Sequence, residues 1–339
     1  MPLGFLLPVA LALGLGLLLP ACGGGSSPGG PTPPTTTPVA RAPVTVVVFY
    51  DEDGDGQADA AEVVRLPGVE VVIGDATART AAGGGAVVQA PLGAQSVALR
   101  TDSVPAYYQR PSPVAVSVPT SVEVLVPVTL PIGDLRRNVY MAFGDSITAG
   151  EGSSDGTGYR NRLDQRLIAH LGTSEVVNAG RPGTQTDEGA DRVVRNLGIF
   201  RPAFTLINYG TNDWNTPQCQ AGPPCDTIDE MRELIDRVQD FGSLPVLSTI
   251  VPVNTALQPA ERNDWVRAQN DNLRQLARAE GVPVADPARL FFAESNLPSL
   301  FADAVHPNDA GYELIARAFF EAITGPRSAS AASFGLTRP

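Results

Sequence analysis

The chain has 339 residues, of which 43% are hydrophobic, and its 36 acidic residues outnumber its 24 basic residues to give a net charge of -12. This length and apolar content suffice for two folded domains with tails. The negative charge opposes binding to phosphate backbones and to anionic lipid surfaces, so it argues against nucleic acid as a partner.

Residues 1–22 are typical of an export signal. An apolar run from Leu3 to Leu19 is short for a membrane span, and small residues ending at Cys22 follow it. The stretch LPAC resembles a bacterial lipobox, which implies that Cys22 is lipidated and that the protein is a cell-surface or periplasmic lipoprotein. The alternative is an ordinary cleaved secretory peptide. Both interpretations predict export, and the lipoprotein interpretation adds membrane contact through the N-terminal lipid anchor only.

Two further segments are predicted to be flexible. Residues 23–43 are nearly all Gly, Ser, Thr and Pro, and residues 326–339 have a similarly loose composition. Such segments bury too little apolar surface to offset the entropy lost on ordering. We therefore expect a tether before the folded body and a flexible tail after it.

Residues 44–131 are predicted to form a small β-sandwich. Short runs rich in Val, several of them alternating with polar residues, are separated by Gly, Pro and Asp turns at the spacing of a sandwich. The runs are VTVVVFY, GVEVVIGD, GAVVQAP, QSVALRT, VAVSVP and VEVLVPVTL. Parts of this pattern resemble the prealbumin-like or B-type modules of bacterial surface proteins.

An acidic loop, DEDGDGQADAAE, follows the first of these runs and predicts a structural calcium site. Carboxylates occupy positions 1, 3, 5, 9 and 12 of the twelve-residue calcium-loop pattern, glycine occupies position 6, and position 7 offers a backbone carbonyl. The expected ligands are Asp51, Asp53, Asp55, Gln57, Asp59 and Glu62. A strand precedes the loop where a calcium sensor has a helix, so we expect a calcium-stabilised β module. The alternative is a solvated acidic turn.

Residues 137–325 change to an alternation of buried strands and amphipathic helices, which predicts a parallel sheet covered by helices on both faces. The expected strands are NVYMAF, EVVN, AFTLINY, LPVLSTIV and VPVAD. Apolar stripes mark two helices, one with Tyr159, Leu163, Leu167 and Leu171 and the other with Tyr312, Ile315, Phe319 and Ile323. We expect Asp309 to cap the last helix.

Four short motifs suggest a serine hydrolase in this domain. Ser146 in FGDSIT follows the first strand, NAGRPGT follows the second, YGTND follows the third, and DAVHP precedes the last helix. The carboxyl ends of parallel strands converge on one crevice. A serine needs a base and the base needs an orienting acid, and the spacing of Asp303 and His306 lets one turn join the two. His170, the other histidine, is expected to be an ordinary helical residue.

These motifs resemble those of the SGNH or GDSL family of serine esterases and acylhydrolases, and the resemblance covers more than half of the chain. It implies a three-layer flavodoxin-like domain, with Ser146 as nucleophile, His306 as base and Asp303 as the orienting acid. It further implies an oxyanion hole formed by the backbone N–H of Ser146, Gly183 and the side-chain amide of Asn212, with Gly180 as the alternative glycine. We expect Asp145 to support the turn, and catalysis to need no cofactor.

The remaining expectations concern the wall of the crevice and the substrate. In an exported chain Cys219 and Cys225, six residues apart, predict a disulfide. This loop, with Tyr209 and Trp214, is expected to line the crevice unless the aromatic rings simply pack. We expect a monomeric esterase for small acyl groups, with an acetylated polysaccharide as one possible substrate. A lysophospholipase or lipase, and a surface adhesion protein with an incidental hydrolase domain, are the alternatives.

Overall fold

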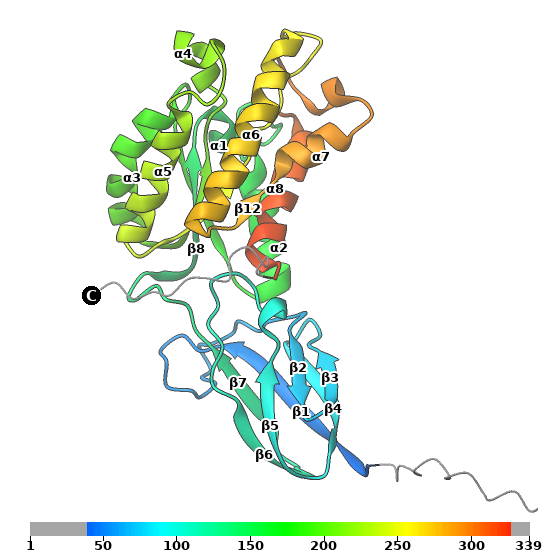
Figure 1. Cartoon of the computed structure of the whole chain (residues 1–339). Helices are drawn as coiled ribbons and strands as arrows, with labels where there is room; N and C mark the ends of the chain where they lie inside the picture. The colour runs from blue at the N-terminus through cyan, green and yellow to red at the C-terminus, as the bar shows by residue number, and fades with distance from the viewer. Residues whose placement is uncertain (1–38, 327–339) are drawn as a thin grey trace, which may run out of the picture. The chain divides into compact units, whose positions relative to one another are not determined.

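The computed structural model describes residues 39–326, which form a β module followed by an α/β domain (Figure 1). The expected signal peptide, the lipidation of Cys22, the tether up to residue 38 and the tail from residue 327 onward lie outside the described residues. Within residues 39–326, none of the helices combines the length and the apolar character that a membrane span requires.

The β module consists of two sheets that enclose one apolar core. The first sheet has the order β4 (Gly85–Pro91), β1 (Arg41–Tyr50) and β7 (Val124–Val128), and the second has the order β3 (Ala76–Arg79), β2 (Glu70–Ile73), β5 (Gly93–Leu99) and β6 (Val114–Val118). Val44, Val46 and Val48 of β1 are fully buried, because side chains two apart on a strand share a face. The predicted sandwich is confirmed.

Strand β3 has no counterpart in the sequence prediction. Its sequence, ATAR, contains a single β-branched residue, so propensity gives little indication of a strand. The strand exists because a two-residue turn at Gly74 and Asp75 folds it back on β2, with Ile73 opposite Ala76. The positive φ of Gly74, 59°, suits such a turn. Pairing with an established strand therefore decides its conformation.

The α/β domain has a five-stranded parallel sheet. Its strands are β8 (Arg136–Gly144), β9 (Glu175–Gly180), β10 (Pro202–Asn208), β11 (Leu244–Ser248) and β12 (Val284–Ala285), arranged in the order β12-β11-β10-β8-β9. Numbered within the domain, this is the order 2-1-3-4-5 of flavodoxin-like folds. The predicted fold class is confirmed.

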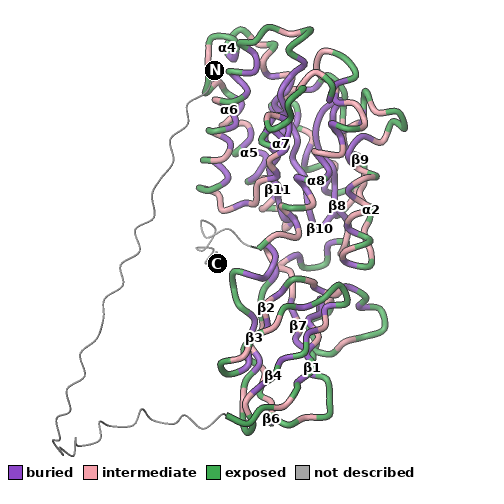
Figure 2. Tube along the Cα trace, turned by 90° about the vertical axis from the view of Figure 1, so that its right-hand side faces the viewer, coloured by how far each residue is buried: buried purple, intermediate pink, exposed green. Residues whose placement is uncertain are grey.

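Helices cover both faces of this sheet (Figures 1 and 2). Alternate residues of β8 point in opposite directions, so Tyr140 joins one core cluster and Met141 joins the other. The first cluster includes α2 (Tyr159–Leu171) and α8 (Asp309–Thr324), and the second includes α3 (Thr186–Phe200), α5 (Thr227–Asp240) and α6 (Ala260–Glu280). Both predicted stripes are buried in full. The shorter helices are α1 (Ser146–Ala149), α4 (Pro217–Gln220) and α7 (Pro287–Ala293).

The cap of α8 differs from the prediction by one residue. Asn308 is the N-cap, and its side-chain oxygen accepts the backbone N–H groups of Ala310 and Gly311. Asp309 is the first residue of the helix, where its carboxylate pairs with Arg162 at 2.8 Å and accepts the N–H of Ser154 at 3.0 Å. Asn and Asp cap helices about equally well, so the sequence does not separate the two.

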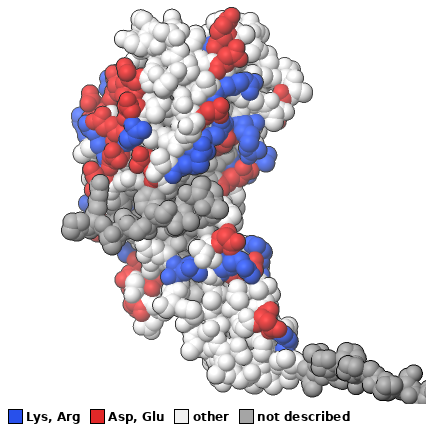
Figure 3. Space-filling model, viewed as in Figure 1, with Lys and Arg blue, Asp and Glu red and all other residues white. Residues whose placement is uncertain are grey.

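Charge is distributed unevenly over the α/β domain. Acidic side chains outnumber arginines over α3 and α5, whereas arginines and acidic side chains are interspersed along α6 (Figure 3). Burial, followed by the negative charges of Asp213 and Asp187, raises the pKa of Glu230 on α5 to about 7. The excess negative charge of the chain is therefore partly concentrated on one flank of this domain.

Candidate active site

The site lies where the strand order of the sheet reverses. β8 is flanked by β9 on one side and by β10 on the other, and chain connections leave β8 and β10 in opposite directions. Open α/β sheets bind ligands at such a point, outside the carboxyl ends of the strands. Ser146 follows β8 and Asn212 follows β10, so both residues lie at this switch point.

A tight turn carries Ser146 out of β8 into α1. Asp145 caps this short helix, with Oδ1 accepting the Ile147 N–H at 2.9 Å. Gly144 admits no side chain, because a Cβ there would lie 2.2 Å from the Asn208 carbonyl oxygen and from the Thr148 hydroxyl. The N–H of Ser146 donates to no acceptor among residues 39–326. The turn thus leaves this N–H available to a ligand.

Ser146, His306 and Asp303 form a continuous hydrogen-bonded chain. His306 Nε2 lies 2.9 Å from Ser146 Oγ, and His306 Nδ1 lies 2.7 Å from Asp303 Oδ2. Asp303 Oδ1 accepts the backbone N–H groups of Val305 and His306 at 2.9 and 2.8 Å. This is the spatial arrangement that an activated serine requires.

The environment keeps Asp303 ionised. Burial raises the pKa of this carboxyl group, but the hydrogen bonds from His306 and Val305 outweigh burial, and the pKa falls below its ordinary value. An ionised Asp303 accepts the Nδ1–H of His306 and so leaves the Nε2 lone pair directed at Ser146.

The two candidate oxyanion glycines have different surroundings. Gly183 has a φ of +79°, space around it for a Cβ, and an N–H that donates to no acceptor in the described part of the chain. The N–H of Gly180 is already donated to Asn178 Oδ1 at 2.9 Å. A Cβ on Gly180 would also lie 2.4 Å from the backbone nitrogen of Ala149. The structure therefore favours Gly183 as the donor and gives Gly180 a packing role.

Asn212 is held beside the second motif. Its side-chain Nδ2 donates to the Thr184 carbonyl at 2.9 Å, which leaves a second N–H on the same nitrogen. The neighbouring Asp213 is buried and accepts hydrogen bonds from the N–H and the hydroxyl of Thr186, at 3.0 and 2.6 Å, and from the Thr227 hydroxyl at 2.8 Å. Asp213 thereby ties the third motif to the starts of α3 and α5.

Arg192 on α3 is a structural residue of the site that the sequence prediction did not include. Its guanidinium donates to the carbonyl of Gly144 at 2.6 Å, to the carbonyl of Ala179 at 2.8 Å and to the Tyr209 hydroxyl. It also lies over the Phe143 ring, 4.2 Å from the ring centroid. One planar side chain with five N–H donors thus connects the ends of β8, β9 and β10.

The two aromatic residues expected in the wall of the crevice, Tyr209 and Trp214, pack against other parts of the domain. Tyr209 is 1% exposed and its hydroxyl contacts Arg192 and Thr184, so the expectation that it lines the crevice is wrong. Trp214 packs edge-on against Trp265, with ring centroids 5.6 Å apart. Trp265 belongs to the second core cluster, and Trp214 is partly buried and packs against it, as the packing alternative expects.

A disulfide joins Cys219 and Cys225, as the sequence predicts. The half-cystine Cys219 is buried, and the sulfur of Cys225 accepts a hydrogen bond from Gln269 at 3.2 Å. The disulfide fastens the loop after the third motif to α6. His170 on α2 packs its ring edge-on against Phe320, and burial lowers the pKa of its imidazole, in agreement with a structural role.

The predicted calcium loop brings together three of its six expected ligands. Carboxylate oxygens of Asp51, Asp53 and Asp55 lie within 4.8 Å of one another. The Glu62 carboxylate instead accepts the backbone N–H groups of Glu52 and Asp59. The charge of Asp55, followed by desolvation and by the charges of Asp53 and Glu62, raises the pKa of Asp59. Gln57 donates its N–H to Asp55. A bound calcium ion stays a prediction.

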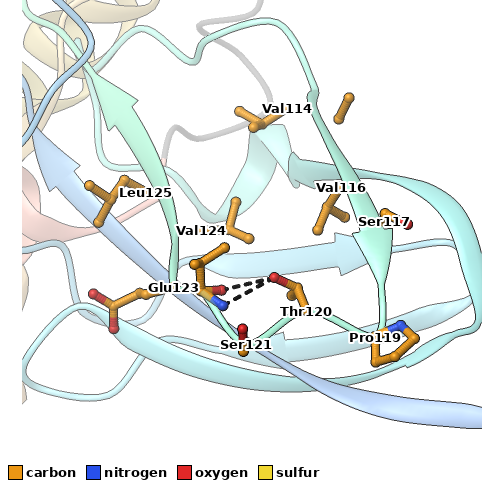
Figure 4. Close-up of a pocket in the computed structure, with 11 residues that line it drawn as sticks. Val114, Val116, Ser117, Pro119, Thr120, Ser121, Glu123, Val124 and Leu125 are labelled. Carbon is orange, nitrogen blue, oxygen red and sulfur yellow. Dashed lines mark hydrogen bonds between the residues drawn. The ribbon is translucent and has the colours of Figure 1, made fainter.

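One hollow of the β module lies between β6, β7 and the turn that joins them (Figure 4). Its volume is about 590 Å³, and Glu123 is the one ionisable group among its lining residues. Thr120 bonds within the turn, to the N–H and the carbonyl of Val122. A single carboxylate offers no acid–base pair, so this hollow lacks the groups that acyl transfer requires.

Comparison with known proteins relates the α/β domain to a family of hydrolases. Residues 142–314 match the model of the GDSL-like Lipase/Acylhydrolase family. The uncharacterized protein YpmR of Bacillus subtilis is 26% identical over 213 residues, which cover 55% of this chain and 81% of YpmR.

Among solved structures, a lipase/acylhydrolase from Enterococcus faecalis is 22% identical, covers 55% of this chain and 95% of its own, and has a TM-score of 0.47. A catalytic mutant of Axe2, an acetylxylan esterase from Geobacillus stearothermophilus, is 21% identical with the same TM-score, and the match covers 55% of this chain and 94% of that one. The family match spans half of the chain and contains the strand-end motifs and the Ser146–His306–Asp303 arrangement described above. The chain therefore belongs to the GDSL-like lipase/acylhydrolase family.

Proposed function

We propose that the protein is an exported serine esterase that hydrolyses neutral carboxylic esters with small acyl groups, such as acetyl groups on a polysaccharide. The observation that carries this proposal is the hydrogen-bonded chain from Ser146 through His306 to Asp303. Family membership supports acyl transfer as the reaction class. The anchor at Cys22 is part of the same proposal and rests on the sequence.

The first half of the reaction acylates the enzyme. His306 Nε2 removes the proton of Ser146 Oγ as the oxygen attacks the ester carbonyl carbon, and Asp303 stabilises the resulting imidazolium. The negative charge on the carbonyl oxygen is stabilised by the N–H groups of Ser146 and Gly183 and by the Asn212 amide. Collapse of this intermediate breaks the bond to the alkoxy oxygen, which takes the proton from His306 and leaves as an alcohol.

The second half regenerates the free serine. A water molecule loses a proton to His306 and attacks the acyl carbon, and the tetrahedral intermediate expels Ser146 Oγ, which regains the proton. The products are a carboxylic acid and the free enzyme. Carboxylates surround the base, since Asp303 and Glu151 both contact the imidazole. This negative charge disfavours substrates with an anionic group beside the carbonyl, which is why we propose neutral esters.

Hydrolysis of p-nitrophenyl acetate by the native chain and by Ser146→Ala tests the proposal. We expect the variant to lose activity by about 10⁴-fold or more, because no hydroxyl remains to form the acyl-enzyme. Ser121→Ala, an exposed serine of the β module, is the matched control and retains the native rate. Equal rates for Ser146→Ala and the native chain would remove the assignment. A series of nitrophenyl esters of increasing acyl length then tests the preference for small acyl groups.

A further inference from the structure

Glu151 places a second carboxylate on the catalytic imidazole. Its Oε2 lies 3.2 Å from His306 Nε2, the same nitrogen that lies 2.9 Å from Ser146 Oγ. The Glu151 side chain is 48% exposed, whereas the His306 side chain is 17% exposed. The carboxylate therefore lies at the solvent-facing edge of the imidazole, on the nitrogen that accepts and returns the catalytic proton.

The backbone holds Glu151 in this position from both sides. Its N–H donates to the Ser146 carbonyl at 3.1 Å, and its carbonyl accepts the Tyr312 hydroxyl of α8. The next residue, Gly152, packs directly on the histidine loop, because a Cβ there would lie 2.6 Å from the Pro307 carbonyl oxygen and 3.0 Å from the His306 Cβ. A flexible surface side chain would lose its contact readily, but here the main chain on both sides of the contact is fixed.

The stabilisation that Glu151 gives to His306 depends on the protonation state of the imidazole. A neutral imidazole directs the Nε2 lone pair toward the serine hydroxyl and offers nothing to a carboxylate. Once Nε2 carries the proton, its N–H becomes a donor and the ring becomes a cation, which a carboxylate at 3.2 Å stabilises. The contact thus favours the imidazolium that forms as each tetrahedral intermediate is made.

On this geometry, and on the serine esterase mechanism proposed above, we infer that Glu151 is a positioning residue that stabilises the protonated base of the reaction. The other ionisable groups that face this region are Asp303 on the histidine loop, Asp145 at the start of α1 and Tyr312 on α8. Asp303 orients Nδ1, Asp145 holds the nucleophile turn and Tyr312 supports the Glu151 backbone. Glu151 is the group whose charge can be removed without disturbing these hydrogen bonds.

The test compares pH profiles of kcat/KM for the native chain, Glu151→Gln and Glu151→Asp. The substrate is p-nitrophenyl acetate, and samples are quenched into alkaline buffer before the nitrophenolate is read. With the carboxylate gone, the imidazolium is less stable, so the loss of activity on the acid side moves to lower pH by about 0.3 to 0.7 unit. The plateau of kcat/KM falls by about twofold to fivefold. The Glu151→Asp profile lies between the other two.

Two controls separate an electrostatic role from a structural one. Glu123→Gln, in the β module, removes the same charge and leaves the acid limb unmoved. Raising the salt concentration screens the half-exposed carboxylates of both Glu151 and Asp303, so the acid limb of the native chain shifts further to lower pH than that of Glu151→Gln, which keeps only Asp303. If Glu151→Gln does not fold, Glu151→Asp replaces it, and its acid limb should shift less with salt than that of the native chain.

The role of Glu151 would be overturned if kcat/KM fell at the same pH for the native chain and Glu151→Gln at low salt. It would also be overturned if the pH at which kcat/KM of the native chain falls did not change with salt. The proposed function fails separately, by undiminished activity of Ser146→Ala. An inactive Ser146→Ala together with an unshifted Glu151→Gln therefore rejects this inference and keeps the esterase.

Discussion

Asp145 is the residue whose environment departs furthest from ordinary solution among the groups next to the nucleophile. It is 1% exposed, one of its oxygens accepts the Ile147 N–H, and its Oδ2 contacts no hydrogen-bond partner among residues 39–326. Desolvation dominates over the hydrogen bond from Ile147 and raises the pKa of this carboxyl group to about 7. Asp145 therefore retains its proton at pH values at which an exposed aspartate is ionised.

This raised pKa makes stability depend on pH in a defined direction. The folded state binds the proton of Asp145 more tightly than the unfolded state, so the stability due to this group is present below pH 4 and is lost as the pH rises toward 7. Asp145→Asn keeps an oxygen for the Ile147 N–H and has no proton to lose. We expect its free energy of unfolding to rise relative to that of the native chain between about pH 4 and pH 7, the interval between the pKa of an unfolded aspartate and that of the folded Asp145.

Urea unfolding at these two pH values measures the gain. Asp191→Asn, at an exposed position on α3, is the matched control and should show a difference from the native chain that does not change with pH. A pH-independent difference for Asp145→Asn would show that the buried carboxyl does not titrate in this range.

At the scale of elements, β9 and the loop after it contain two glycines that are required for different reasons. Gly180 needs the absence of a side chain because it lies against the nucleophile turn, and Gly183 needs a positive φ. Gly180→Ala should displace the backbone near Ala149 and reduce both stability, by about 1 to 3 kcal/mol, and kcat. Gly183→Ala should cost about 1 to 2 kcal/mol of stability from its left-handed backbone while its N–H remains. Unfolding curves and kcat for both variants measure the contrast.

If Gly180→Ala unfolds like the native chain and keeps its kcat, the nucleophile turn does not depend on the close contact between the two loops.

The sequence predicted the elements whose own residues determine them. The strands β10 and β11 are buried at every position, and the stripes of α2 and α8 are buried over their full length. Ser146 stands in a short motif at a strand end, and Asp303 and His306 stand in a short motif before the last helix. The resemblance of these motifs to those of a known family named the three residues. Arg192 and Glu151 were not named, because their partners lie far along the chain: Arg192 contacts Gly144, 48 residues away, and Glu151 contacts His306. Contacts of this kind leave no periodic signal.

At the scale of the whole molecule, the β module and the α/β domain differ in the interactions that stabilise their loops. The loops of the α/β domain are closed by hydrogen bonds to strand ends, by the Asp213 network and by a disulfide. The acidic loop of the β module instead groups carboxylates with one another. Like charges at this spacing repel, and a divalent cation removes the repulsion.

We therefore predict that Ca²⁺ raises the melting temperature of the protein. Binding at a hundredfold excess over Kd stabilises the folded state by about 2.7 kcal/mol. The increase should disappear in the double variant Asp53→Ala plus Asp55→Ala and persist in the control Asp102→Ala plus Glu123→Ala, which removes the same charge from the same module. Thermal unfolding with added Ca²⁺, Mg²⁺ or chelator measures it. If Ca²⁺ does not change the melting temperature of the native chain, the loop is a solvated acidic turn.

Asp303 and His306 belong to a single short turn, and the carboxylate binds both the ring and the main chain of that turn. The base and its partner consequently travel as one rigid unit whenever this part of the chain shifts. The placement of the base relative to the nucleophile then depends on one remaining coordinate, the separation between the imidazole and the serine oxygen. A ligand, a neighbouring molecule or a crosslink that tilts the turn by about 1 Å would lower activity by about a hundredfold without unfolding the enzyme or disturbing the ion pair.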